Sequence, residues 1–352
     1  MIFLIVLLLT GVARAEEVIG IDTDALTEGL DDEVTELLPK FSADGGVDFW
    51  ESLKTVLFGS LTSLRESYRS ALKLCAVLLA VATLCAVAST SQHHLADAST
   101  IAGALGLTVA VLSTFSAMIG LATQTVRDIT DYSACFLPVM ASATMMSGGV
   151  TSGSSLYAGT VLFSQLLMQL ISKLLVPAVT VYLLLAMAEA ALSNQMLSEL
   201  RELVGWLISK SLRILMYIFI AYISLTGVLS GSSDAATLKA TKAAISGMIP
   251  VVGSIVSDAS ESLIASATML KSAVGMFGML AVLGICLAPF LTVGTHYLML
   301  KVTAAVSGTV GLKPHVKLLK SFSAAMGYLL AMCGVCALLL LISTVCFLKV
   351  VQ

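Results

Sequence analysis

Long apolar runs, each bounded by short polar segments, fill most of the chain after residue 70. The first two clear runs are Ala71–Ala88 and Ile101–Thr123, and each has about the 17 to 25 residues that a helix needs to cross a bilayer. Further runs occupy residues 156–192, 214–230 and 326–348. No alternation of period two, the mark of a membrane β-barrel, competes with them. The pattern therefore predicts an all-α polytopic membrane protein.

Ahead of these runs, apolar residues recur at helical spacing among acidic ones. One amphipathic helix is predicted within Leu26–Leu38, and a second begins at Asp48, where Asp48 and Glu51 have the spacing of a capping box. Two interpretations fit this region. The helices lie on the membrane or dock a partner, or they form a small hairpin that caps the membrane domain.

Two pairs of prolines indicate an internal duplication. Pro138 and Pro177 are 39 residues apart, and Pro250 and Pro289 repeat this spacing 112 residues later. The sequence therefore predicts two tandem membrane repeats whose helices are broken at these four prolines. At the same offset, eight residues of the first copy have an identical counterpart in the second copy. They are Pro138, Val139, Ser142, Ser154, Leu175, Pro177, Thr180 and Val181.

The relative orientation of the repeats depends on how many helices cross the membrane between Pro138 and Pro250. Two crossings make the repeats parallel, and three make them inverted. Arg201 and Lys313 are equivalent at the 112-residue offset, and each lies in a basic stretch. If both stretches are cytoplasmic, the repeats are parallel, which is the arrangement we favour.

Each interruption in the first repeat allows more than one structure. Met145–Ser155 is rich in glycine and serine, which predicts a broken or re-entrant helix or a surface turn, because lipid-exposed backbone groups would stay unpaired. Residues 156–192 are too long for one span, so they form two short spans or one long helix kinked at Pro177. Leu197–Leu212 predicts an interfacial helix with Trp206 near the headgroups, followed by the next span.

Composition supports a membrane location and separates an acidic region from the rest. Hydrophobic residues make up 58% of the chain and charged residues 12%, unlike a soluble domain. Residues 16–48 hold 11 of the 22 acidic residues. Residues 1–15 have an apolar core and end in Ala13-Arg14-Ala15, which predicts a secretory signal peptide cleaved before Glu16. The alternative is an uncleaved anchor.

These signals divide the chain into five parts. They are the signal peptide 1–15, an acidic amphipathic-helical region 16–70, the first transmembrane helices 71–130, repeat 1 at 131–233 and repeat 2 at 234–349. Arg65, Arg69 and Lys73 precede the first span, where the positive-inside rule favours the cytoplasm and a cleaved signal favours the opposite side. The sequence alone leaves the overall orientation open.

Charged residues within the apolar segments are the candidate pathway residues, because charge is costly inside a membrane. Asp258 and Glu261 are three residues apart and share a helix face, which suits a cation or proton site. The alternative places the charges at the membrane surface, with the lysines snorkelling or paired with an acid in the bundle. The full candidate set is Lys173, Glu189, Asp258, Glu261 and Lys271.

Other kinds of site lack support in the sequence. There is no nucleotide-binding loop, HExxH sequence or nucleophile elbow, so no catalytic residue is predicted and the chain is not expected to be an enzyme. Cys333 and Cys336 form a CxxC pair without further ligands, and His93 and His94 also stand alone. We therefore expect no metal and no cofactor. Nucleic acid is not an expected partner, since basic residues do not cluster broadly.

The second repeat carries a specific resemblance. The run from Met248 to Ser254, together with Asp258-Ala259 and Leu270-Lys271, resembles the stage III sporulation protein AE family, and so does the run Ser147–Ser152. The resemblance covers most of the chain and is strongest between Asp131 and Leu300. It implies a multipass protein of endospore-forming bacteria, made in the mother cell and placed in the membrane around the forespore.

The resemblance also implies membership of a channel- or secretion-like complex that supports late forespore gene expression. The expected partners are other membrane subunits and an ATPase of the same operon, a forespore-side channel partner and the lipid bilayer. The alternative is a stand-alone secondary transporter for a small solute, which the duplicated, proline-broken halves and the embedded charges favour.

Overall fold

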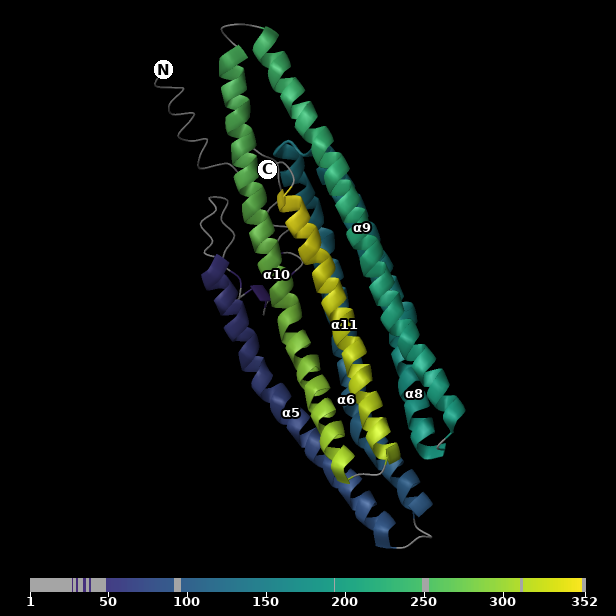
Figure 1. Cartoon of the computed structure of the whole chain (residues 1–352). Coiled ribbons are helices and arrows are strands. Elements are labelled where there is room, and N and C mark those ends of the chain that lie inside the picture. Colours follow the sequence, from purple (N-terminus) through teal and green to yellow (C-terminus); the bar gives the residue numbers. More distant parts are fainter. Residues whose placement is uncertain are drawn as a thin grey trace.

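A computed structural model shows the chain as a bundle of long helices (Figure 1). The structure describes residues 49–91, 96–192, 194–248, 253–310 and 313–349, with a few single residues between 27 and 38; some side chains within these ranges, chiefly in 227–263, are not described. Among the described residues every secondary-structure element is a helix, which confirms the all-α prediction. The signal peptide 1–15 lies outside the described residues.

The described helices form six passes along the bundle. Consecutive passes run in opposite directions, and α7, a π-helical turn η2 and α8 together make one pass (Figure 1). The elements are α5 (Phe49–Ser91), α6 (Ala96–Met146), α7 (Val150–Leu170), η2 (Ile171–Leu175), α8 (Val176–Leu192), α9 (Gln195–Met248), α10 (Gly253–Val310) and α11 (Lys313–Lys349). Helix α11 is central and packs against α6 to α10.

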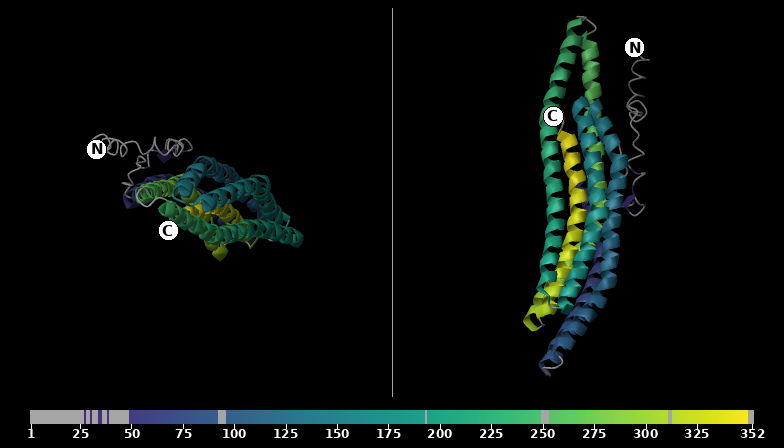
Figure 2. Two further views of the ribbon diagram at one scale, coloured as in Figure 1. Left: turned by 90° about the horizontal axis from the view of Figure 1, so that it is seen from above. Right: turned by 90° about the vertical axis from the view of Figure 1, so that its right-hand side faces the viewer.

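Each pass contains a segment long and apolar enough to cross a membrane, as the sequence predicted for a polytopic protein. These segments have 32 to 47 residues, so at about 1.5 Å per residue the longest reaches roughly 70 Å, against roughly 30 Å for the hydrocarbon core. The helices therefore extend past the bilayer. At one end α9 and α10 project beyond the other helices (Figure 2).

Helix α9 corrects one prediction. The sequence indicated an interfacial helix at Leu197–Leu212 and a separate span after it, whereas a single helix of 54 residues covers both. No proline occurs between Pro177 and Pro250, so no residue of α9 lacks the backbone N–H that continues a helix. Trp206 is exposed on this helix.

The prediction that Pro138 and Pro289 break their helices is also wrong. Helices α6 and α10 continue through them. A proline removes one backbone hydrogen bond, and packing against neighbouring helices offsets that loss in a bundle. Ser142 lies one turn after Pro138, and its hydroxyl donates to the carbonyl of Pro138 at 2.8 Å. Pro250 lies outside the described residues.

Pro177 has a distinct effect on its helix. Residues 150–192 form one continuous helical pass, so the interpretation as two short spans is wrong. Just before the proline, the helix widens into the π-helical turn η2, in which the N–H of Val176 donates to the carbonyl of Ile171. Pro177 has no N–H to offer the carbonyl of Lys173, and the wider turn accommodates its ring. Lys173 is exposed there.

The glycine- and serine-rich stretch forms a tight turn between α6 and α7. Gly148 has φ of 99°, a left-handed conformation that glycine adopts without strain. The N–H of Gly149 donates to the carbonyl of Thr144, and the N–H of Gly148 to that of Met145, which is the Schellman pattern of a helix C-terminus. Of the two predicted structures, the turn is the one observed.

The direction of the passes bears on the predicted repeats. Helices α8 and α10 contain Pro177 and Pro289 and run the same way, while α9 and α11 follow them and run the opposite way (Figure 1). Two passes separate Pro138 from Pro250, which is the number that parallel repeats require if both passes cross the membrane. The duplication itself stays a prediction.

Candidate functional site

The structure describes the side chains of three of the five predicted pathway residues, and these three lie in different surroundings. Glu189, near the end of α8, and Lys271, on α10, are buried, with 7% and 1% of their surface exposed. Lys173 is exposed on η2. Asp258 and Glu261 lie on α10, but their side chains are outside the part that the structure describes.

Glu189 is bound by two basic side chains from other helices. Nε of Arg201, on α9, donates to Oε2 of Glu189 at 2.8 Å, and Nζ of Lys317, on α11, contacts Oε1. Lys317 also donates to the hydroxyl of Ser198 at 2.9 Å. Removing a carboxylate from water is costly, and these paired charges compensate for that cost. One glutamate thus joins α8, α9 and α11.

The guanidinium of Arg201 also contacts an aromatic side chain, Tyr182. It donates from Nη1 to the hydroxyl of Tyr182 at 3.1 Å, and its guanidinium lies 5.7 Å from the centre of that ring. Tyr182 meets Tyr328 edge to face at 5.3 Å. Gly205 makes room for this pair, since a Cβ there would lie 2.5 Å from the Tyr328 hydroxyl. Aromatic rings therefore fix the guanidinium in place.

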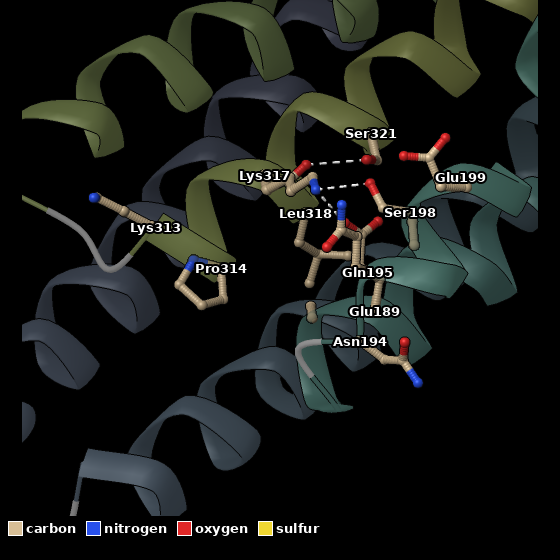
Figure 3. A pocket seen from close by; sticks show the side chains of 12 residues that line it. Glu189, Asn194, Gln195, Ser198, Glu199, Lys313, Pro314, Lys317, Leu318 and Ser321 are labelled. Atoms are coloured by element: carbon tan, nitrogen blue, oxygen red, sulfur yellow. Dashed lines mark hydrogen bonds and ion pairs between the residues drawn. The ribbon is translucent and has the colours of Figure 1, made fainter. Parts of the chain in front are cut away.

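A pocket of about 450 Å³ opens beside Glu189, where the end of α8 and the starts of α9 and α11 meet (Figure 3). Asn194 lies at the start of α9 and accepts a hydrogen bond from the N–H of Met196 at 2.9 Å, as an N-cap residue does. Figure 3 shows Lys317 reaching across to Ser198. The rest of the lining includes Gln195, Glu199, Lys313 and Ser321.

A second hollow, of about 320 Å³, lies on the other side of Arg201. Its lining includes the rings of Tyr182 and Tyr328 and, from α9, Trp206, Lys210 and Arg213. Arg201 and its buried partner therefore form the wall between two polar hollows at one end of the bundle. Among the described residues, no group of three His, Cys, Asp or Glu side chains suited to a metal occurs.

A comparison with known protein families shows which family the chain belongs to. A family model described as stage III sporulation protein AE matches residues 33–350. The chain belongs to the stage III sporulation protein AE family. A curated relative, stage III sporulation protein AE of Bacillus subtilis (strain 168), is 23% identical over 237 residues, which is 67% of this chain and 59% of the relative. No solved structure matches the chain.

Family membership and the six long apolar helices make this chain a sporulation-related multipass membrane protein. The resemblance found in the runs at 147–152 and 248–254 is confirmed. The match to the curated relative spans about 59% of that protein's length, so the relative's assembly and partners are not transferred outright.

Of the three charged residues in this cluster, sequence reasoning identified Glu189 and missed its two partners, Arg201 and Lys317. Arg201 is the counterpart of Lys313 at the repeat offset, and Lys317 follows Lys313 by four residues in the same basic stretch. The structure places both stretches at one end of the bundle, where they meet the same carboxylate. The available signal was an acid near the end of one apolar run and basic residues shortly before each of two later runs.

The run from Gly148 to Ser152 has a partner that sequence reasoning also missed. Gly149 occupies the N-cap position of α7 and has no side chain to cap the helix. Asp234, on α9, supplies the carboxylate instead, accepting from the backbone N–H groups of Thr151 and Ser152 at 2.9 Å each. The start of α7 is therefore capped from another helix.

Proposed function

We propose that the chain is a non-enzymatic membrane subunit of a channel- or secretion-like complex that joins mother cell and forespore. In this role it is needed for late forespore gene expression. It resides in the mother-cell membrane that surrounds the forespore. Its partners are the other membrane subunits and the ATPase of the same sporulation operon, and a channel partner on the forespore side.

The family match over residues 33–350 carries this proposal. A bundle whose helices exceed the bilayer thickness supports it, because the excess length offers protein surface on both sides of the membrane. The charges that the structure describes around Glu189 also suit a structural role. They are satisfied by one another, as expected for residues that hold helices together.

The test is affinity purification of the tagged chain from sporulating cells, followed by mass spectrometry. The operon's ATPase and membrane subunits should be enriched over a control with the same tag on an unrelated multipass protein. A homogeneous chain recovered without any of these subunits would contradict the proposal. In the same cells, deletion should abolish a late forespore reporter, and the chain expressed in the mother cell should restore it.

A stand-alone secondary transporter is the second candidate, favoured by the pocket of about 450 Å³ beside a buried carboxylate. It predicts gradient-driven solute uptake by purified chain in proteoliposomes, abolished by Glu189→Gln or Lys271→Ala. Exposed Glu199 lines the same pocket, so Glu199→Gln is the matched control. Absence of uptake across a broad panel of solutes would leave the complex subunit as the function.

A further inference from the structure

The hollow lined by Trp206, Lys210 and Arg213 has an excess of positive charge. Arg201, at its inner wall, is already bound to Glu189, and Glu202 pairs with it at the rim at 3.4 Å. Among the described residues, Lys210 and Arg213 make no ion pair. Two basic groups therefore line an open cavity without acids of their own to neutralise them.

The same face of α9 turns apolar immediately beyond this hollow. Trp206, Lys210, Arg213, Tyr217 and Ile220 follow at intervals of four and three residues, so they share one side of the helix. Tyr217 is 65% exposed and Ile220 42% exposed, in a segment apolar enough to cross a membrane. A ligand lying along this face would meet basic groups at one end and hydrocarbon-like surface at the other.

We propose that this face of α9 binds an anionic phospholipid. The phosphate headgroup occupies the hollow, where Lys210 and Arg213 donate to its oxygens and the tyrosine hydroxyls lie at the inner wall. The acyl chains lie along Tyr217 and Ile220. Trp206 sits beside the headgroup, which is the place that tryptophan favours at a membrane interface.

Two features favour a lipid over a soluble phosphate. The cavity opens on the helix face that continues into exposed apolar side chains, which a free anion does not contact. The basic stretches of α9 and α11 also lie at the same end of the bundle, and the positive-inside rule assigns that end to the cytoplasmic leaflet, where anionic lipid is available.

The test is native mass spectrometry of the purified full chain in uncharged detergent, titrated with phosphatidylglycerol or phosphatidylcholine of matched acyl chains. Each basic residue near an anionic surface strengthens binding about fivefold, so Lys210→Gln/Arg213→Gln should weaken phosphatidylglycerol binding roughly 25-fold. The control, Arg65→Gln/Arg69→Gln, removes the same charge from an exposed face of α5 and should change affinity less than about twofold. Lys210→Arg/Arg213→Lys, which keeps both charges, should retain most of the binding.

Thermal unfolding in the same detergent checks that all variants are folded. Equal binding of the two lipids by the wild-type chain, or unchanged phosphatidylglycerol affinity in Lys210→Gln/Arg213→Gln, would overturn the proposal. Complete displacement of phosphatidylglycerol by millimolar inorganic phosphate would assign the cavity to a soluble anion and would also overturn it. Preference for phosphatidylglycerol that phosphate does not displace supports the lipid.

Discussion

The carboxylate of Asp234 accepts a hydrogen bond from the backbone N–H of Thr151 at 2.9 Å, although 83 residues separate them. Its second oxygen binds the next N–H, that of Ser152. Asp234 is buried, so water does not replace these bonds when the side chain is removed. The contact fastens α9 to the first turn of α7.

Truncation of Asp234 should destabilise the bundle. Asp234→Ala leaves the first N–H groups of α7 without acceptors, and loss of a helix cap costs about 1 to 2 kcal/mol of the free energy of unfolding. Asp234→Asn should cost less, since an amide oxygen still accepts one bond. Thermal or denaturant unfolding in detergent measures both. Equal stability of wild type and Asp234→Ala would show that the cap contributes nothing.

The contribution of Asp234 should also depend on pH. Asp234 lies beyond residue 230, where the apolar run of α9 ends. Burial alone raises the pKa of its carboxyl, but hydrogen bonds from Ser152 and Thr151 outweigh burial and hold the pKa below its usual value. The stabilisation is therefore complete above the unfolded pKa of about 3.9 and is lost as the pH falls through the lower folded pKa. The stability difference between wild type and Asp234→Ala should be constant near neutral pH and shrink below about pH 4.

Glu189→Gln should destabilise the chain more strongly. It leaves Arg201 and Lys317 without their shared carboxylate, and breaking a buried ion pair costs about 3 to 5 kcal/mol. Lys317→Gln should cost about 1 kcal/mol or less, because the Lys317 side chain is half exposed and its pairing is screened by water. Unfolding midpoints in detergent measure each effect.

Glu199→Gln is the control for that comparison, since Glu199 is an exposed acid of the same pocket and should change stability by less than about 0.5 kcal/mol. A double-mutant cycle of Glu189→Gln with Arg201→Gln isolates their coupling. Additive effects of the two substitutions would mean that the pair is not coupled.

Two glycines should respond oppositely to alanine. A Cβ at Gly278, on α10, would lie 2.1 Å from Cε2 of Phe136, on α6, and overpacking of this kind costs about 1 to 3 kcal/mol. Gly120, on α6, has nothing within 4 Å of the same position, so Gly120→Ala should stabilise the helix by about 0.5 to 1 kcal/mol. Unfolding of the two variants in one detergent checks the sign. Phe136→Leu should partly rescue Gly278→Ala, and a neutral Gly278→Ala would refute close packing there.

Reporter fusions should place successive turns on alternate sides of the membrane. Six crossings put residues 92–95, 193–194 and 311–312 on one side, and residues 147–149 and the end of α11 on the other. The basic stretches adjoin 193–194 and 311–312, so that side should be the mother-cell cytoplasm. The start of α5 then lies outside, which is where a cleaved signal peptide delivers it. Two neighbouring turns reported on the same side would reduce the number of crossings.

The sequence predicted the helices better than their ends and contacts. Apolar runs identify helices because a membrane leaves the backbone few alternatives. Proline was the less reliable signal: Pro138 and Pro289 lie within helices and Pro177 widens one into a π turn. A proline in the sequence shows that one backbone N–H is missing. Whether the helix continues through it depends on packing against the neighbouring helices, which the local sequence does not show.

The candidate site was predicted only in part. The position of Glu189 in an apolar run indicated that it needed a partner, yet Arg201 and Lys317 come from two other helices. The capping role of Asp234 was harder still to predict, because Asp234 lies in a polar stretch and caps a helix 83 residues away. Such contacts depend on how the helices stack along one another, which the spacing of residues within each helix does not record.

The projection of α9 and α10 has a consequence for how two membranes are bridged. Between Ser230, where the apolar run of α9 ends, and Met248 there are 18 residues, a rise of roughly 27 Å. If the chain is a subunit of the proposed complex and its basic end is cytoplasmic, this helical hairpin stands in the gap between the two membranes as a stalk, and Asp234 fastens α9 to α7. A subunit rooted in the forespore membrane would meet the stalk before it reached the mother-cell lipid. The length of the stalk would then limit how far apart the two membranes can lie while the machine stays joined.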